Sequence, residues 1–145
     1  MKDIHVSILE RLRYVKDGTS LAPISDLVGG RIFGEFADHG TKRPYLTFDH
    51  VSTASSRLGF GENNRMMHRA NIVIRAYGDV EEGAESVCEI GDRVVESFNF
   101  YRDTSVTTFE VLNYKVTSGT TIERADDTVV AVVGLLAHGI QNSGV

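Results

Sequence analysis

The chain has 145 residues, 41% of them hydrophobic and 24% charged, which predicts one soluble folded domain over residues 1–145 rather than a disordered chain. Twenty acidic against fifteen basic residues give a net charge of −5, whereas proteins whose main task is binding nucleic acid usually carry a basic surplus. The single cysteine excludes an intrachain disulfide framework and a cysteine-built zinc site. The longest apolar run, residues 129–137, is too short to cross a bilayer as a helix, and we expect no secretory signal and a cytosolic location.

The first predicted element is an amphipathic helix over residues 3–16, which ends before Gly18. Its apolar residues recur at helical spacing while charged residues occupy the other faces. These apolar residues are Ile4, Ile8, Leu9, Leu12 and Val15. A short helical turn is expected within residues 23–28.

Three strands are expected next, over residues 31–36, 45–52 and 66–77, because apolar and polar residues alternate along the last two. The first is short and contains Gly34, which favours a bend or bulge. Residues 53–64 are rich in Ser, Gly and Asn. We therefore expect them to form a loop or the flexible tip of a long hairpin.

The strongest helical pattern covers residues 80–100, where apolar residues recur at helical spacing. Asp79 and Glu82 have the spacing of a capping box at its start. Gly91 lies on the apolar face, so we expect another element to pack closely there. Cys88 lies on the same face and is expected to be a small buried core residue, since a reactive thiol needs exposure and a basic neighbour.

The last third of the chain predicts strands at residues 109–114, 120–124 and 129–137. The last is apolar throughout, as in a central strand that is buried on both faces. The order of elements excludes a doubly wound parallel sheet. It predicts an α+β fold with a mainly antiparallel sheet packed against the N-terminal helix and one long central helix.

No catalytic motif is present in the sequence, so we expect no catalytic residue, no metal, no cofactor and no enzymatic activity. The histidines lack the close spacing of metal ligands, and no phosphate-binding glycine loop or Gly-x-Ser-x-Gly elbow occurs. One alternative remains open. His50 and His68 lie on neighbouring predicted strands and, with Asp49, form the candidate centre of a small ligand-binding or enzymatic domain.

The candidate functional site is instead a protein interface at the 53–64 hairpin. Exposed apolar side chains on a polar loop are potential contact anchors, and basic residues, including His68 and Arg75, gather around this hairpin. The predicted interface residues are Arg57, Leu58, Phe60, Asn63, Arg65 and Arg69. Two alternatives remain open: the apolar pair folds back onto the domain's own core, and the basic residues form a solvated strand face.

Several features in chain order resemble one protein family. They are the N-terminal helix, Gly30-Arg31-Ile32-Phe33, Arg43-Pro44-Tyr45-Leu46-Thr47-Phe48, the strand Ala70-Asn71-Ile72-Val73-Ile74-Arg75-Ala76-Tyr77, and Gly78-Asp79 before the long helix. In this layout the chain resembles the tail-terminator, or tail-completion, proteins that join head to tail in long-tailed double-stranded DNA phages and prophages.

The resemblance implies a non-enzymatic virion structural protein that forms a homo-oligomeric ring, typically a hexamer. Such a ring caps the head-proximal end of the tail tube, stops tube polymerisation and joins the tail to the head. Its implied partners are further copies of the chain, the tail tube protein and a head connector or neck protein. DNA only passes through the bore, and no membrane is involved. The implied location is the virion tail, with the host cytoplasm during assembly. A head-completion or neck adaptor protein is the alternative within this class.

Overall fold

The computed structural model describes residues 2–13, 23–34, 37, 40–58, 65–106, 109–125 and 127–141. The helices are α1 (Lys2–Arg13), α2 (Ile24–Leu27), the 3₁₀ turn η1 (Val80–Glu82) and α3 (Glu85–Phe98). The strands are β1 (Ile32–Gly34), β2 (Tyr45–Leu58), β3 (Arg65–Asp79), β4 (Phe109–Ala125) and β5 (Thr128–Gln141).

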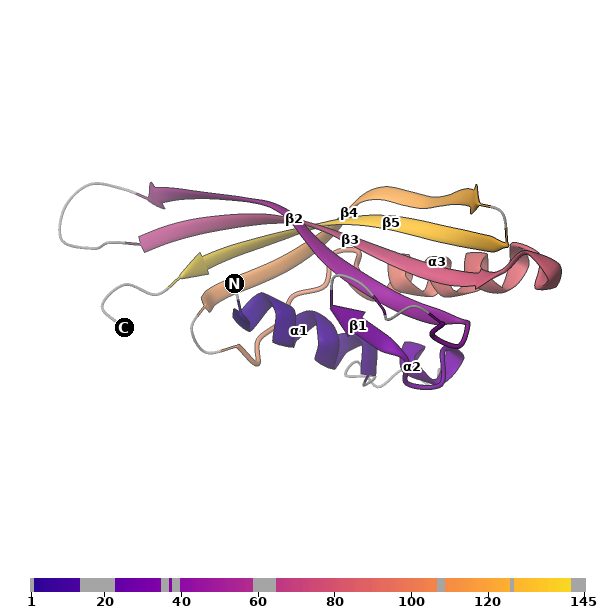
Figure 1. The fold of residues 1–145 in the computed structure, drawn as a ribbon. Coiled ribbons are helices and arrows are strands. Elements are labelled where there is room, and N and C mark those ends of the chain that lie inside the picture. Colours follow the sequence, from indigo (N-terminus) through magenta and orange to yellow (C-terminus); the bar gives the residue numbers. More distant parts are fainter. Residues whose placement is uncertain are drawn as a thin grey trace.

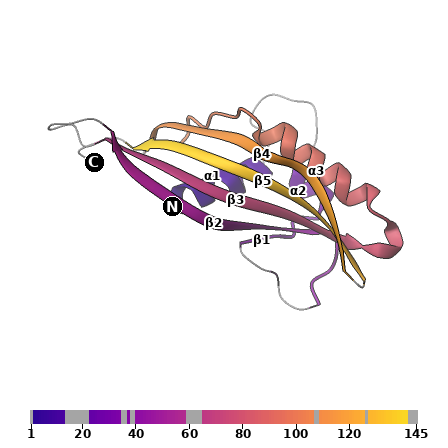
Figure 2. The ribbon, with the colours of Figure 1, turned by 90° about the horizontal axis from the view of Figure 1, so that it is seen from above.

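The strands form one twisted sheet in the order β1-β2-β3-β5-β4, and α1, α2 and α3 all lie on one side of it (Figure 1). Only β1 and β2 are parallel, and the other three neighbouring pairs are antiparallel. Seen from above in Figure 2, the strands lie in front and the helices behind them or beyond β4. The prediction of an α+β fold with a mainly antiparallel sheet is therefore confirmed.

The hairpin of β2 and β3 is longer than predicted. β2 continues to Leu58, so residues 53–58 are strand and not loop, and they belong to a long hairpin as in the second of the two predicted alternatives. Residues 59–64 lie outside the described residues. The register continues to the pair of Leu58 and Arg65 after a bulge near Val51. Ser and Thr are compatible with a strand once a partner strand supplies backbone hydrogen bonds, and local composition does not reveal that partner.

β4 is also longer than predicted, because residues 109–125 form one strand where we expected two. Its pairing with β5 shifts register around Val116 and Ser118, where polar residues and Gly119 interrupt the alternation. Bulges of this kind hide a continuous strand from an argument based on period two.

The start of α3 differs from the predicted capping box. β3 runs on to Asp79, η1 follows, and α3 begins only at Glu85 after Ala84, which makes no side-chain capping bond. The Asp79 carboxylate instead accepts a hydrogen bond from Arg43 Nη1 at 2.8 Å. Arg43 also lies 3.5 Å from Asp127, so it links the ends of β2, β3 and β5.

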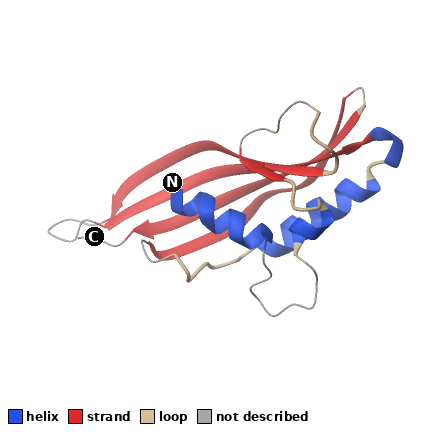
Figure 3. Cartoon of the chain, turned by 60° about the horizontal axis from the view of Figure 1, so that its bottom comes forward, coloured by secondary structure: helices blue, strands red, loops and turns tan. Residues whose placement is uncertain are grey.

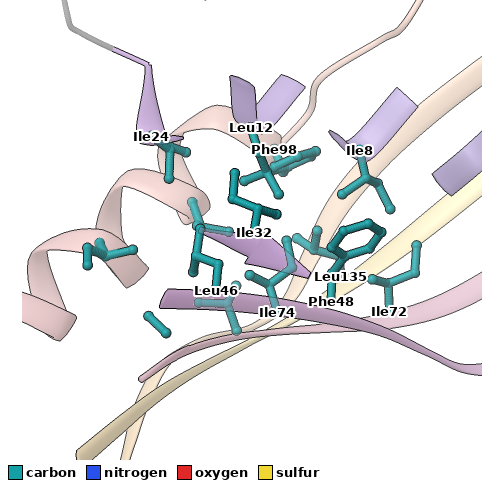
Figure 4. Packing of buried hydrophobic residues seen from close by; sticks show 14 of the residues in the cluster. Ile8, Leu12, Ile24, Ile32, Leu46, Phe48, Ile72, Ile74, Phe98 and Leu135 are labelled. Atoms are coloured by element: carbon teal, nitrogen blue, oxygen red, sulfur yellow. The ribbon is translucent and has the colours of Figure 1, made fainter. Parts of the chain in front are cut away.

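The hydrophobic core fills the space between the sheet and the helices. Ile4, Ile8 and Leu12 of α1 are at most 1% exposed, and Phe98 of α3 is fully buried. Figure 4 shows these helices meeting the sheet, with labelled side chains Ile8, Leu12, Ile24, Ile32, Leu46, Phe48, Ile72, Ile74, Phe98 and Leu135. Each large apolar side chain buried in this way contributes about 1.5–3 kcal/mol.

The close contact expected at Gly91 is present. A Cβ atom added at Gly91 would lie 2.7 Å from Thr120 Cγ2 of β4. Beside it, the Thr120 hydroxyl donates to Asp92 Oδ1 at 2.8 Å. The absence of a side chain at Gly91 therefore allows α3 to pack directly on β4.

Burial along β5 alternates, contrary to the expected burial on both faces. Val133, Leu135 and Ala137 are buried against the helices, whereas Val132 and Leu136, which point to the other face, are partly exposed. The physical reason is that no described helix covers that second face (Figures 2 and 3). It is called the uncovered face below.

A buried polar cluster joins α1 to β4 and to the segment after α3. Tyr114 Oη donates to Ser7 Oγ at 2.7 Å, and Ser7 Oγ donates to an Asp103 carboxylate oxygen. Burial raises the pKa of the Tyr114 hydroxyl well above its usual value. Arg11 donates to the Ser97 carbonyl oxygen and its guanidinium lies over the Tyr101 ring, 3.9 Å from the centroid. These bonds fix α1 against the sheet.

Candidate functional site

Only some residues of the predicted hairpin interface are among the described residues. Phe60 and Asn63 lie outside the described residues, whereas Arg57 and Leu58 end β2 and Arg65 begins β3. The hairpin of these two strands extends at one end of the sheet (Figure 1). Its role as an interface remains a prediction.

The two candidate histidines do not meet across the hairpin. His50 is opposite Ile72, which is four residues from His68, so the two backbones lie about 13 Å apart along the strands. His68 is held by Ser55 Oγ at 2.7 Å and by Gln141 Oε1 at 2.8 Å. His50 is hydrogen-bonded to the nearby Thr53.

Asp49 does not join the histidines either. As the neighbour of His50 in β2, it points to the opposite face of the sheet, where Arg75 Nη1 donates to it at 2.6 Å. Within the described ranges no group of three or more His, Cys, Asp or Glu side chains is placed to hold a metal ion. The structure thus separates the residues of the proposed ligand-binding centre.

Arg69 has a different setting, in a row of side chains that crosses the uncovered face. Strand register places Arg69 of β3 opposite His138 of β5, and His138 opposite Asn113 of β4. Arg102 continues the row through a bridge to Asn113 beyond the edge of β4. The row therefore combines residues from four separate parts of the chain.

These residues line an open pocket of about 710 Å³, called the cationic pocket below. Its lining residues are Arg69, Phe100, Arg102, Asn113, Tyr114, Lys115, Leu136 and His138. Arg69, Arg102 and Lys115 bring positive charge, and no lining residue is a carboxylate. Within the part of the chain that the structure describes, none of these three cations forms an ion pair. The charge of the pocket is thus available to an anionic partner.

Phe100 adds an apolar group at the rim of this pocket. Its side chain is 79% exposed, and its backbone has φ 59°, in the left-handed region that bulky residues rarely adopt. A large exposed aromatic ring in a strained conformation is typical of a contact residue.

A second charged surface lies on α3. Glu85, Glu89, Asp92 and Glu96 recur at helical spacing on one face, called the acidic ridge below. Cys88 and Arg93 line the same shallow groove. Cys88 is only partly buried, so its predicted place in the core is wrong: its position on the helix lies at the border between the apolar face and the ridge.

Sequence reasoning found one residue of the cationic pocket, Arg69, and missed the other lining residues. Phe100, Arg102, Lys115 and His138 are distant in sequence and belong to no motif. Strand register brings Lys115 and His138 together, and the bridge between Arg102 and Asn113 brings the segment after α3 alongside them. A weak signal existed in the alternation of His138 and Asn113 with apolar neighbours, which places both on the outward face.

Comparison with known proteins bears on the fold. No protein-family model matches the chain, and no curated protein matches it. Among solved structures, a chain of the virion of a native gene transfer agent particle is similar, with a TM-score of 0.51 and 12% identity over 92% of this chain and 91% of that chain. At this identity the similarity concerns the fold alone. The class defined is therefore a two-layer α+β domain, and the same fold occurs in a chain of that virion.

No described helix combines the length and the apolar composition that a membrane-spanning helix needs.

Proposed function

We propose that this chain is a non-enzymatic structural protein of a phage-like virion, and that it acts as a tail terminator. In this role copies form a ring, with six subunits as the expected number, at the head-proximal end of the tail tube. The ring stops tube polymerisation and binds the head connector, and DNA passes through its bore.

One observation carries the proposal: the similarity to a virion chain extends over nine-tenths of both chains. The match is thus to a whole domain and not to a shared fragment. The order of elements along the chain, which resembles that of the tail-terminator family, supports the proposal as well. A structural role also agrees with a surface that has two charged regions of opposite sign, since assembly needs complementary faces.

The test is removal of the gene from the element that encodes it, followed by electron microscopy of the particles. We expect tails of abnormal, unregulated length and heads without tails, both restored by the gene in trans. Mass spectrometry of purified particles should detect the chain at a few copies per virion. Normal particles without the chain would refute a structural role.

The same experiment separates the terminator from a neck adaptor. Loss of a terminator leaves tube polymerisation without a stop, so tail lengths vary. Loss of a neck adaptor leaves tails of uniform length that do not attach to heads. If the tails are uniform in length but unattached to heads, the chain is a neck adaptor and not a tail terminator.

A further inference from the structure

We propose that the cationic pocket of one copy binds the acidic ridge of α3 in the next copy, so that subunits associate head to tail. The inference rests on the self-assembly contained in the proposed function and names the two surfaces that would perform it. The occupant of the pocket is thus a second copy of this chain.

The two surfaces have opposite charge and similar length. Arg69, His138, Asn113 and Arg102 lie on adjacent backbone segments, which gives a row of about 14 Å at a spacing of about 4.8 Å. The acidic ridge covers the twelve residues from Glu85 to Glu96, and the eleven steps between them span about 16 Å of helix at 1.5 Å per residue. Carboxylates along the ridge can therefore meet cations along the row.

The two surfaces belong to different layers of the same subunit. Strand register places Arg69, Leu136 and His138 of the pocket on the uncovered face. α3 packs on the other face of the sheet (Figures 1 and 3). No residue lines both the pocket and the ridge groove. Among the described residues the pocket and the ridge of one copy do not contact each other, so each copy can present one surface of each kind. Such a contact is heterologous, and repeated heterologous contacts close into a ring when the rotation between subunits allows it.

Each surface also has an apolar component. Phe100 lies at the rim of the cationic pocket and is 79% exposed. On the acidic ridge the partly exposed Cys88 lies among the carboxylates and gives the Phe100 ring an apolar contact. Arg93, the basic residue of the ridge groove, already has an interaction within its own chain.

The net charge argues for a protein partner over a nucleic acid. Each copy carries −5 overall, so a polyanion approaching three cations would also be repelled by the rest of the surface. A second copy presents its negative charge in an ordered row on a rigid helix.

The first test uses charge reversal on each surface. The pocket variant is Arg69→Glu with Lys115→Glu, and the ridge variant is Glu89→Lys with Glu96→Lys. Asp92 is left in place because it binds Thr120. The matched controls, with equal charge changes at exposed positions elsewhere, are Lys42→Glu with Arg124→Glu and Glu81→Lys with Glu123→Lys.

Self-association is measured by sedimentation velocity at low salt up to high protein concentration. We expect the association of each surface variant alone to be weakened about tenfold or more, and the controls to associate as the wild type does. An equimolar mixture of the two variants should associate again, because each reversed surface then meets a partner of opposite sign. The four substitutions combined in one chain should restore association too.

The second test uses the native thiol of the ridge as a probe. Asn113→Cys places a thiol in the middle of the cationic row. Mild oxidation should then give disulfides between Cys88 of one copy and position 113 of another, identified by mass spectrometry of the linked peptides. Adding Cys88→Ser should abolish this product, and the pocket and ridge variants should each reduce it strongly.

The results of these two tests distinguish failure of the proposed interface from failure of the proposed function, which the tail-length test measures. Association that persists unchanged in both surface variants, or no link between positions 88 and 113 at any concentration, overturns this interface while abnormal tails still support the proposed function. Binding of a 20-base-pair DNA duplex that the pocket variant abolishes, without self-association of the wild type, overturns it in favour of a nucleic-acid partner. Normal particles after gene removal refute the proposed function itself.

Discussion

The two faces of the sheet differ most clearly at neighbouring residues of β5. Leu135 is 1% exposed and packs among the helices, whereas Leu136 lines the cationic pocket on the uncovered face and is partly exposed. The sequence treats them alike, as two leucines in one apolar run. The difference teaches that burial, and with it most of the stabilisation, lies on the helix-covered face, while the uncovered face mixes apolar side chains with polar and charged ones, as in an antiparallel sheet with one face open to water.

The largest effect is expected when this pair is truncated one residue at a time. Leu135→Ala creates a cavity in a packed core and should lower the free energy of unfolding by about 2–5 kcal/mol. Leu136→Ala removes a partly solvated side chain and should cost less than half as much. Urea denaturation of both variants measures the difference. Equal losses would show that the uncovered face is as tightly packed as the covered one.

A second effect comes from filling the space between α3 and β4. Gly91→Val would overlap Thr120 and should cost about 1–3 kcal/mol, part of which Thr120→Ala should recover. On the uncovered side, Gly134→Val meets the exposed side chains of Thr117 and Ser118. Both can turn toward water, Ser118 at the cost of the exposed hydrogen bond that its Oγ accepts from the Gly134 N–H at 3.0 Å. We expect a smaller loss there in thermal denaturation. A larger loss at Gly134 would contradict the proposed difference between the faces.

Removal of a buried hydroxyl group should destabilise the chain on the covered face and should not destabilise it on the uncovered face. Ser7→Ala leaves the Asp103 carboxylate and the Tyr114 hydroxyl without a bond that each has in the native chain, at a cost of about 1–3 kcal/mol. Thr47, near Arg75 on the uncovered face, is 1% exposed, and its hydroxyl has no hydrogen-bond partner among the described residues. Thr47→Val should therefore leave stability unchanged or raise it by about 1 kcal/mol. A destabilised Thr47→Val would indicate that this hydroxyl is bonded in solution.

The smallest expected effect near neutral pH concerns two tyrosines. Their contribution to the free energy of unfolding changes only in alkaline solution. Burial raises the pKa of Tyr114 in the folded chain above its ordinary value of 10.0, so the unfolded chain loses this proton first. The associated stability is fully present below pH 10 and falls by up to about 1.4 kcal/mol per pH unit above it. Tyr114→Phe should flatten this alkaline decline in denaturation curves.

Tyr45 provides the comparison on the uncovered face. Desolvation also raises its pKa, but the ring, which stacks on Tyr77 at 4.7 Å, is only partly buried. Tyr45→Phe should change the alkaline decline less than Tyr114→Phe does. The reverse order would place the more strongly desolvated tyrosine on the uncovered face.

The local sequence pattern was sufficient to predict much of the helix-covered face of the sheet and the helices that pack on it. Ile4, Ile8 and Leu12 recur at helical spacing and are all buried, and the alternation around Ile72 and Ile74 identifies both the strand and its inner face. Such periodicities follow from the backbone geometry of helices and strands. They are therefore present in any short window of sequence.

The local sequence pattern could not predict where the strands and α3 begin and end, nor which residues form the candidate site. Residues 53–58 and 115–119 are rich in polar residues, and they belong to strands because a neighbouring strand supplies their hydrogen bonds. Asp79 satisfies a motif for a helix cap, yet Arg43, which is distant in sequence, binds it instead. In each case a partner from elsewhere in the chain outweighs a local preference of about 1 kcal/mol.

The sequence by itself determined the fold class, the helical and strand faces of the core, and the close contact at Gly91, because these depend on spacing along the chain. Only the tertiary structure decided that Arg69, Arg102, Lys115 and His138 share one pocket and that one face of the sheet is uncovered. The physical reason is register. Side chains on neighbouring strands meet across about 4.8 Å whatever their separation in sequence, and a one-residue shift would send them to the opposite face.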